Sequence, residues 1–225
     1  MAINLKSTNT LGADKLKMLV YGQAGSGKTS LIPTLPQPVI ISAEAGLLSI
    51  AGADIPFVEV ADIETLREAY QWAMESDEAK QFESIALDSI SEIGEVVLSN
   101  EKARQKDPRA AYGEMQDQMG QLIRAFRDMP NKHVYFTAKL EKSQDEMGRM
   151  LYAPSMPGNK AGQALPYQFD IVAALRMERD AEGNMQRALM LESDGMWQAK
   201  DRSGKLDPWE APDLGVLIKK IGGTQ

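Results

Sequence analysis

The sequence of 225 residues predicts an α/β fold: a mostly parallel sheet flanked by helices and extended by antiparallel hairpins toward the C-terminus. Two observations predict it. Short apolar segments rich in β-branched residues alternate with helical patterns over the first part of the chain. From about residue 141, short strand-like segments follow one another across glycine-containing turns, which is typical of hairpins. No repeat or Pro/Ser-rich linker divides the chain, so we expect one domain over residues 1–225, with residues 1–15 as an N-terminal extension and residues 205–225 as a C-terminal helix.

Five segments have the length and composition of buried strands. They are KMLVYG (17–22), PVIISAE (38–44), FVEVAD (57–62), SIALDSI (84–90) and HVYFTAKL (133–140). Between them, the clearest helical patterns cover residues 63–76 and 112–129, where apolar side chains recur every three or four positions. Because strands and helices alternate, we expect the strands to run parallel and the helices to cover the sheet.

The later segments are predicted to form the antiparallel part of the sheet. They are GRMLYAPS (148–155), FDIVAALRMERD (169–180), MQRALMLES (185–193) and MWQAKDRSG (196–204). Residues 211–223, APDLGVLIKKIGG, are amphipathic and end at glycine, which favours a closing helix with a glycine cap.

Composition excludes several classes of protein. Hydrophobic residues make up 43% and charged residues 25% of the chain, as in an ordinary globular protein. No apolar run approaches the roughly 18 residues of a membrane span, and the first residues lack the apolar core of a signal peptide, so we expect a cytoplasmic protein with no membrane partner. Zero cysteines and a single histidine, His133, exclude zinc-thiolate, iron–sulfur and histidine-rich metal sites.

The charge is distributed unevenly. The net charge is −7, but residues 34–100 hold 13 acidic against 2 basic side chains, whereas residues 101–167 hold 11 basic against 8 acidic ones. Long-range attraction of a polyanion to the whole molecule is therefore unfavourable. If a nucleic acid binds, we expect local contacts with the basic residues of segment 101–167.

Residues 22–29, GQAGSGKT, match the pattern GxxxxGK[ST] between an apolar strand and a helical stretch. Glycines let the backbone curl so that successive N–H groups point at phosphate oxygens, and the next helix is expected to add its positive end. Lys28 is expected to reach the β- and γ-phosphates of ATP, and the Thr29 hydroxyl to bind Mg²⁺. The predicted nucleotide-binding residues are Gly22, Gln23, Ala24, Gly25, Ser26, Gly27, Lys28, Thr29 and Ser30.

A second oxygen ligand for Mg²⁺ is predicted at Asp88, which ends the apolar segment FESIALD (82–88). An aspartate after a strand can instead cap the helix that follows it. In many ATPases this aspartate is followed directly by the glutamate that activates water, but here Ser89 follows. The catalytic base must therefore come from another segment.

The segment VIISAE ends in Glu44, at what should be the same edge of the sheet as the phosphate loop. Here the sequence resembles the RecA-like ATPases, in which an apolar strand ending in Ala-Glu or Gly-Glu carries the general base. The resemblance implies that Glu44 polarises the attacking water. The alternative is a solvated loop glutamate; Glu92 and Glu95, on the helix after Asp88, are weaker candidates for the base.

The resemblance continues from Asp88 to Arg179, in the order aspartate-ending strand, first DNA loop, long helix, sensor strand, second DNA loop and return strand. Residues 198–204, QAKDRSG, are similar to the Lys-x-Arg-x-Gly hairpin of RecA-family helicases. By that resemblance Lys200 and Arg202 act in trans, on the γ-phosphate held by a neighbouring subunit. A charged turn in water is the alternative. Thr137 or Lys139, at the end of the sensor strand, is a candidate γ-phosphate sensor.

Taken whole, the chain resembles the small phage-encoded nucleotide-binding proteins with a RecA-like core, an AAA-domain group that includes single-strand-annealing recombination proteins. The resemblance implies an oligomeric ring or filament that acts with ATP and Mg²⁺ on single-stranded DNA, in the host cytoplasm and with a single-strand-binding protein as a possible partner. It leaves open a nucleotide-gated assembly or packaging accessory. A small-molecule kinase is the weaker alternative, because the sequence shows no arginine-bearing lid.

Cations crowd the two segments that correspond to DNA loops, residues 101–109 and 141–164. Cations that follow phosphates, with aromatics such as Tyr112 and Tyr152 between them, suit binding of a single strand without regard to its sequence. A solvated charged surface explains each segment equally well. The predicted DNA-binding residues are Lys102, Arg104, Lys106, Arg109, Lys142, Arg149 and Lys160.

Overall fold

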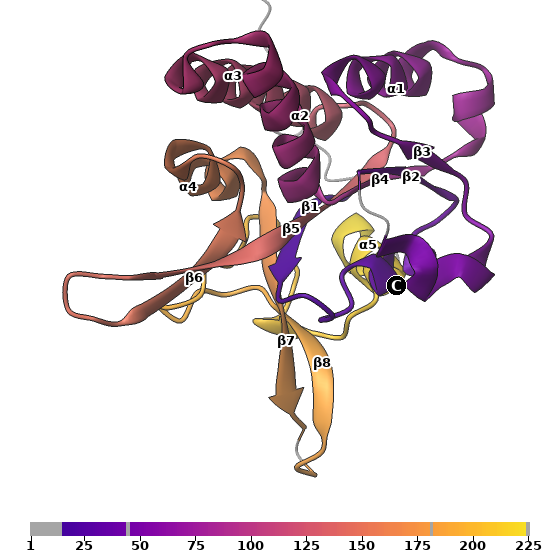
Figure 1. Ribbon diagram of the computed structural model, residues 1–225. Coiled ribbons are helices and arrows are strands. Elements are labelled where there is room, and N and C mark those ends of the chain that lie inside the picture. The colour runs from indigo at the N-terminus through magenta and orange to yellow at the C-terminus, as the bar shows by residue number, and fades with distance from the viewer. Residues whose placement is uncertain (1–14, 44–45, 181, 224–225) are drawn as a thin grey trace, which may run out of the picture.

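The computed structural model describes residues 15–43, 46–180 and 182–223, without the side chains of residues 159–161 (Figure 1). Its strands form one sheet in the order β10-β8-β7-β1-β5-β4-β2-β3, with β6 paired to β5 and β9 paired to β7. The strands are β1 (Lys17–Gly22), β2 (Pro38–Ser42), β3 (Phe57–Glu59), β4 (Ser84–Asp88), β5 (His133–Gln144), β6 (Met150–Ser155), β7 (Ile171–Arg179), β8 (Met185–Met190), β9 (Lys200–Asp201) and β10 (Trp209–Glu210). The helices are α1 (Ile63–Glu75), α2 (Ile90–Arg104), α3 (Pro108–Arg127), α4 (Asn159–Gln168) and α5 (Leu214–Gly222), with short 3₁₀ helices η2 (Thr29–Thr34), η3 (Gly46–Ala53) and η4 (Glu78–Gln81).

Strands β3, β2, β4, β5, β1 and β7 run parallel to one another, so their carboxyl ends share one edge of the sheet. β5 lies between β1 and β4, in a register that pairs Val20 with Thr137 and Leu87 with Phe136. The pairs β5–β6, β7–β8, β8–β10 and β7–β9 are antiparallel. The predicted fold class, a mostly parallel α/β sheet with antiparallel strands toward the C-terminus, is confirmed.

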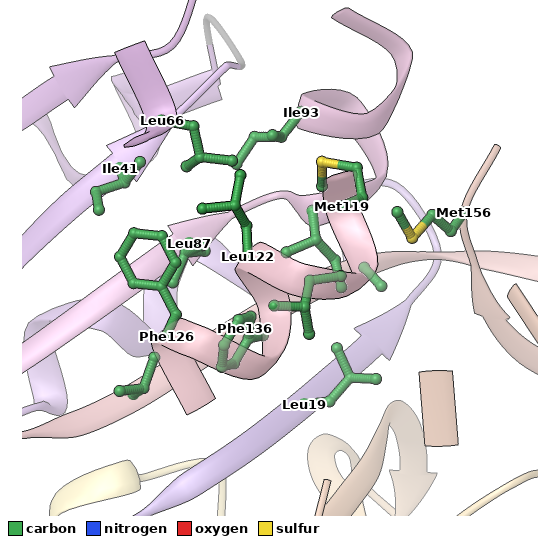
Figure 2. Packing of buried hydrophobic residues seen from close by; sticks show 14 of the residues in the cluster. Leu19, Ile41, Leu66, Leu87, Ile93, Met119, Leu122, Phe126, Phe136 and Met156 are labelled. Atoms are coloured by element: carbon green, nitrogen blue, oxygen red, sulfur yellow. The ribbon is translucent and has the colours of Figure 1, made fainter. Parts of the chain in front are cut away.

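Both faces of the sheet are buried, which explains why its strands are continuously apolar. On β1, Leu19 and Tyr21 join the core under the helices α1, α2 and α3, while Met18 and Val20 join the core under η2 and α5. Figure 2 shows strand residues such as Leu87 gathered beneath α3. No helix in the described part of the chain has the length and apolar character needed to cross a bilayer.

The predicted first DNA loop, residues 101–109, is wrong. Lys102 and Arg104 lie in the last turn of α2, and α3 begins at Pro108, so the connection is only residues 105–107. The reason is local: the Asp107 side chain accepts a hydrogen bond from the Arg109 backbone N–H (2.9 Å), and a proline fits the first helical turn, where no N–H bond is required.

The second predicted DNA loop, residues 141–164, is not a loop either. β5 continues to Gln144 and turns into β6, and α4 begins at Asn159. The helix expected after the phosphate loop is the six-residue 3₁₀ helix η2, which contains Pro33. The strand predicted over residues 196–204 is reduced to β9, because Asp194 and Asp201 accept hydrogen bonds from backbone N–H groups and hold turns on either side of it.

Candidate functional site

The phosphate loop joins the end of β1 to η2, and its glycines have distinct structural reasons. Gly25 (φ +74°) and Gly27 (φ +99°) have left-handed backbones that favour glycine. At Gly22 a methyl group would lie 2.9 Å from the Leu175 carbonyl oxygen of the adjacent β7, so the close approach of the two strands excludes a side chain there. The glycine positions of the motif are therefore those at which this chain needs glycine to form the curled loop.

Lys28 is held across the loop that contains it. Its ammonium group donates hydrogen bonds to the carbonyl oxygens of Gly22 (3.0 Å) and Gln23 (3.1 Å). Its own carbonyl oxygen accepts a hydrogen bond from the hydroxyl of Tyr135 on β5 (2.9 Å). Burial, and then the charge of Asp88, raise the pKa of Tyr135 well above its usual value, so the hydroxyl stays protonated and remains a donor. The loop is thus anchored to the strand that separates β1 from β4.

Asp88 lies at the carboxyl end of β4 and is buried, with 2% of its surface exposed. Its carboxylate accepts hydrogen bonds from the Thr29 hydroxyl (2.8 Å) and from the Thr137 hydroxyl of β5. Asp88 does not cap the following helix. That position belongs to Ser89, whose hydroxyl accepts from the Glu92 backbone N–H (3.3 Å).

The chemistry of this donor set fits Mg²⁺ bound together with phosphates. A threonine hydroxyl and a carboxylate, both hard oxygen donors, lie side by side at the edge of the phosphate loop. Across the described residues, no group of three or more His, Cys, Asp or Glu side chains is arranged to hold a metal ion. Mg²⁺ in nucleotide sites typically takes one or two protein oxygens and completes its octahedron with phosphate oxygens and water.

A cleft of about 690 Å³ opens over the loop at the carboxyl edge of the sheet. Besides the loop, it is lined by Asp88, by Gly46 and Ser49 of η3, and by cations from two hairpins. Lys139 and Lys142 come from β5, and Arg187 comes from β8. Lys139 also forms an ion pair with Glu92.

Three residues reach the loop or its cleft without a sequence pattern that predicts this role. Arg187 was not singled out because nothing in its neighbourhood in the sequence marks it, and only the order of the strands brings it to the loop. Tyr135 lies in the predicted strand 133–140, and no sequence pattern marks its hydroxyl as a contact of the loop. Lys142 was predicted to bind DNA but lies in the wall of the phosphate cleft.

Two further catalytic candidates, Lys200 and Arg202, do not lie in this cleft. Glu44 lies outside the described residues. Lys200 and Arg202 lie on and after β9, which pairs with the start of β7 at the amino edge of the sheet, opposite the phosphate loop. Arg202 is 3.2 Å from the Asp170 carboxylate. Burial and then the charge of Arg202 lower the pKa of Lys200.

The DNA-binding candidates are spread over several elements. Lys102 lies over the Tyr112 ring (4.9 Å to its centroid), and Arg104 forms an ion pair with Glu101 (3.4 Å). Lys106 lies in the short α2–α3 connection and Arg109 in the first turn of α3. In the β5–β6 turn, Arg149 forms an ion pair with Asp145 (2.7 Å). The side chain of Lys160 lies outside the described part of the chain.

The sequence profile of a family described as "AAA domain" matches residues 14–203. A crystal structure of a KaiC-like protein from the hyperthermophilic archaeon Pyrococcus horikoshii is similar, with a TM-score of 0.43 and 13% identity over 77% of each chain. None of the curated proteins matches the chain in sequence.

Proposed function

The chain belongs to the AAA domain family, and from that membership we propose that it is an ATPase of RecA-like type that works with ATP and Mg²⁺ on single-stranded DNA. One observation carries the ATPase part of the proposal. Asp88 joins the Thr29 hydroxyl at the phosphate loop to the Thr137 hydroxyl of β5, so the metal-binding oxygens, the loop and the candidate sensor strand form one connected unit.

In this proposal the chain's own groups bind and orient the triphosphate. The N–H groups of the loop hold phosphate oxygens, and the Lys28 ammonium exchanges its bonds to the Gly22 and Gln23 carbonyls for bonds to the β- and γ-phosphates. Thr29 and Asp88 supply oxygens to Mg²⁺, which neutralises charge that builds on the phosphates. Glu44 polarises the attacking water, and Thr137 keeps the Asp88 carboxylate oriented.

We place Lys200 and Arg202 in the site of a neighbouring subunit of a ring or filament. They lie at the amino edge of the sheet, and Arg202 is exposed there, so they are directed away from the phosphate loop of their own chain. In the transition state their charges stabilise the leaving phosphates. This arrangement makes turnover depend on assembly.

Single-stranded DNA is the partner that we propose for the α2–α3 junction. The last turn of α2, the short connection and the first turn of α3 carry Lys102, Arg104, Lys106 and Arg109, and the Tyr112 ring lies beneath Lys102. A phage-type role in recombination, annealing or repair, within the cytoplasm and with a single-strand-binding protein nearby, is consistent with this set of groups.

The test measures phosphate release with and without single-stranded DNA, together with particle size. We expect turnover that needs Mg²⁺, rises with DNA and is lost in Lys28→Ala. A double reversal, Lys102→Glu with Arg104→Glu, should weaken DNA binding at least tenfold and flatten its dependence on salt. The control is the double variant Arg67→Glu with Lys80→Glu. Both residues are exposed, and each forms an ion pair with an acidic residue three positions earlier, as Arg104 does. If the two double variants bind DNA with the same affinity and the same dependence on salt concentration, the proposed DNA site is refuted.

A nucleotide-gated assembly accessory is the second candidate, and the two projecting hairpins favour it (Figure 1). Each carries an exposed methionine near its tip: Met147 is 79% exposed in the β5–β6 turn, and Met185 is 52% exposed at the start of β8. Exposed methionines are frequent on surfaces that bind other proteins, because the side chain is flexible and polarizable. In that case Glu44→Gln would trap an assembled species, and DNA would leave the rate of phosphate release unchanged.

A further inference from the structure

The β7–β8 hairpin extends beyond the end of β1 and over the phosphate loop. The pairing of β1 with β7 ends at Tyr21 and Ala174, whereas β7 continues to Arg179 alongside β8. Figure 1 shows this hairpin projecting from the body of the sheet. The register of these two antiparallel strands therefore fixes the positions of the hairpin side chains near the phosphate loop.

The register assigns Arg187 to the face of the hairpin on which the loop lies. Leu175 and Leu189 are opposite one another and are buried against Leu31 and Ile32 of η2, which directly follows the loop. Side chains two positions apart on a strand share a face. Arg187, two residues before Leu189, is therefore on the same face, one step nearer the hairpin tip.

The guanidinium group lies against the loop itself. A methyl group built on Gly27 would be 2.9 Å from Arg187 Cζ and 3.0 Å from Nη1, and Arg187 lines the cleft together with Lys28. Arg187 makes no hydrogen bond or ion pair with any residue that the structure describes. Its neighbours on β7 differ: Arg176 forms an ion pair with Glu178 (2.7 Å), and Arg179 donates to the Gly183 carbonyl (2.7 Å). No described carboxylate therefore neutralises the Arg187 charge beside the loop.

We propose that Arg187 binds the phosphate chain of the nucleotide held by the loop of its own chain. The inference rests on the proposed function and adds to it a phosphate ligand in cis. Five N–H donors in a planar fork match phosphate oxygens, which accept charge-assisted hydrogen bonds. Lys200 and Arg202 lie at the opposite edge of the sheet, so each subunit recognises phosphate with its own arginine before any neighbour contributes.

The experiment compares Arg187→Ala and Arg187→Lys with Arg179→Ala, which removes the same charge from the same hairpin. ATP and inorganic tripolyphosphate each compete with a fluorescent ATP analogue for the site. We expect Arg187→Ala to weaken both competitors about tenfold, the loss expected for one charge-assisted hydrogen bond. The affinities of Arg187→Lys should lie between those of Arg187→Ala and the wild type, and the affinities of Arg179→Ala should equal those of the wild type.

Three results would overturn the inference. Unchanged tripolyphosphate affinity with weakened ATP affinity would mean that Arg187 contacts the base or sugar. If Arg187→Ala keeps its affinity for ATP and tripolyphosphate while Lys28→Ala loses both affinities, Arg187 is not a phosphate ligand, and the proposed function is unaffected. Nucleotide binding restored by mixing Lys28→Ala with Arg187→Ala subunits would show that the arginine acts in trans. A wild-type protein that binds neither competitor would instead refute the proposed function, and the inference with it.

Discussion

His133 should make the stability of the fold depend on pH in mildly acidic solution. It begins β5, only 3% of its surface is exposed, and its Nδ1 accepts a hydrogen bond from the Leu16 backbone N–H (2.9 Å). That bond requires a neutral ring with its proton on Nε2. Burial, and then the charges of Lys15 and Lys17, lower the pKa of His133 from 6.5 to about 4.

The sign and size of the effect follow from this difference. Between about pH 6.5 and pH 4 the unfolded chain binds a proton at this ring and the folded chain does not, so the free energy of unfolding rises with pH. The contribution of His133 is fully present above the unfolded pKa and is lost as the pH falls through this window. From 6.5 to about 4, at about 1.36 kcal/mol per pH unit, it amounts to about 3 kcal/mol.

The assay is urea unfolding of the wild type and of His133→Asn at several values between pH 7 and pH 4. The asparagine side chain keeps a hydrogen-bond acceptor near the position of Nδ1 and does not titrate. We expect the wild type to lose about 3 kcal/mol more than the variant across this range. Carboxylates with lowered pKa, such as Asp128, destabilise both proteins equally in acid. If the free energy of unfolding falls equally with pH in the two proteins, the reasoning is refuted.

Three further predictions concern the site. Thr137→Val removes a hydroxyl that orients Asp88, so the Mg²⁺ concentration that half-saturates nucleotide binding should rise about tenfold; an unchanged titration would contradict the role of Thr137. Gly27→Ala forces a side chain onto a left-handed backbone and into the cleft, so ATP binding should fall by more than about tenfold in isothermal titration, and wild-type affinity would contradict the loop geometry. Mixing Lys28→Ala with Arg202→Ala subunits should restore phosphate release at mixed interfaces, whereas complete inactivity at every ratio would argue against trans catalysis.

The parts of the site that the sequence predicted are those carried by contiguous residues. The loop from Gly22 to Thr29 follows a strand directly, and Asp88 ends an apolar segment, so local patterns were sufficient to place them. The contacts that connect these parts come from β5. Thr137 and Tyr135 reach Asp88 and the loop only because β5 is inserted between β1 and β4, and no local pattern specifies that order.

The errors have a physical cause as well. The RecA-like order of elements predicts a DNA loop that includes Lys102 and Arg104, although Asp107 followed by Pro108 is a sequence signal for a helix start. Lys102 and Arg104 are compatible with a helix because they lie in the last turn of α2, where cations interact favourably with the helix dipole. The order of elements in a similar family therefore did not fix the residue at which this helix ends.

One strand sets the positions of both groups of candidate arginines. The start of β7 pairs with β9, so Val172 lies opposite Lys200, and its far end pairs with β8, so Met177 lies opposite Arg187. Through Ile171–Ala174, β7 also pairs with β1, which carries the loop. A neighbour that packed its amino edge against this cleft would add its Lys200 and Arg202 to a site where Arg187 is already present. Losing Arg187 should then weaken binding in every subunit, assembled or not, whereas losing Arg202 should reduce turnover only in the assembly.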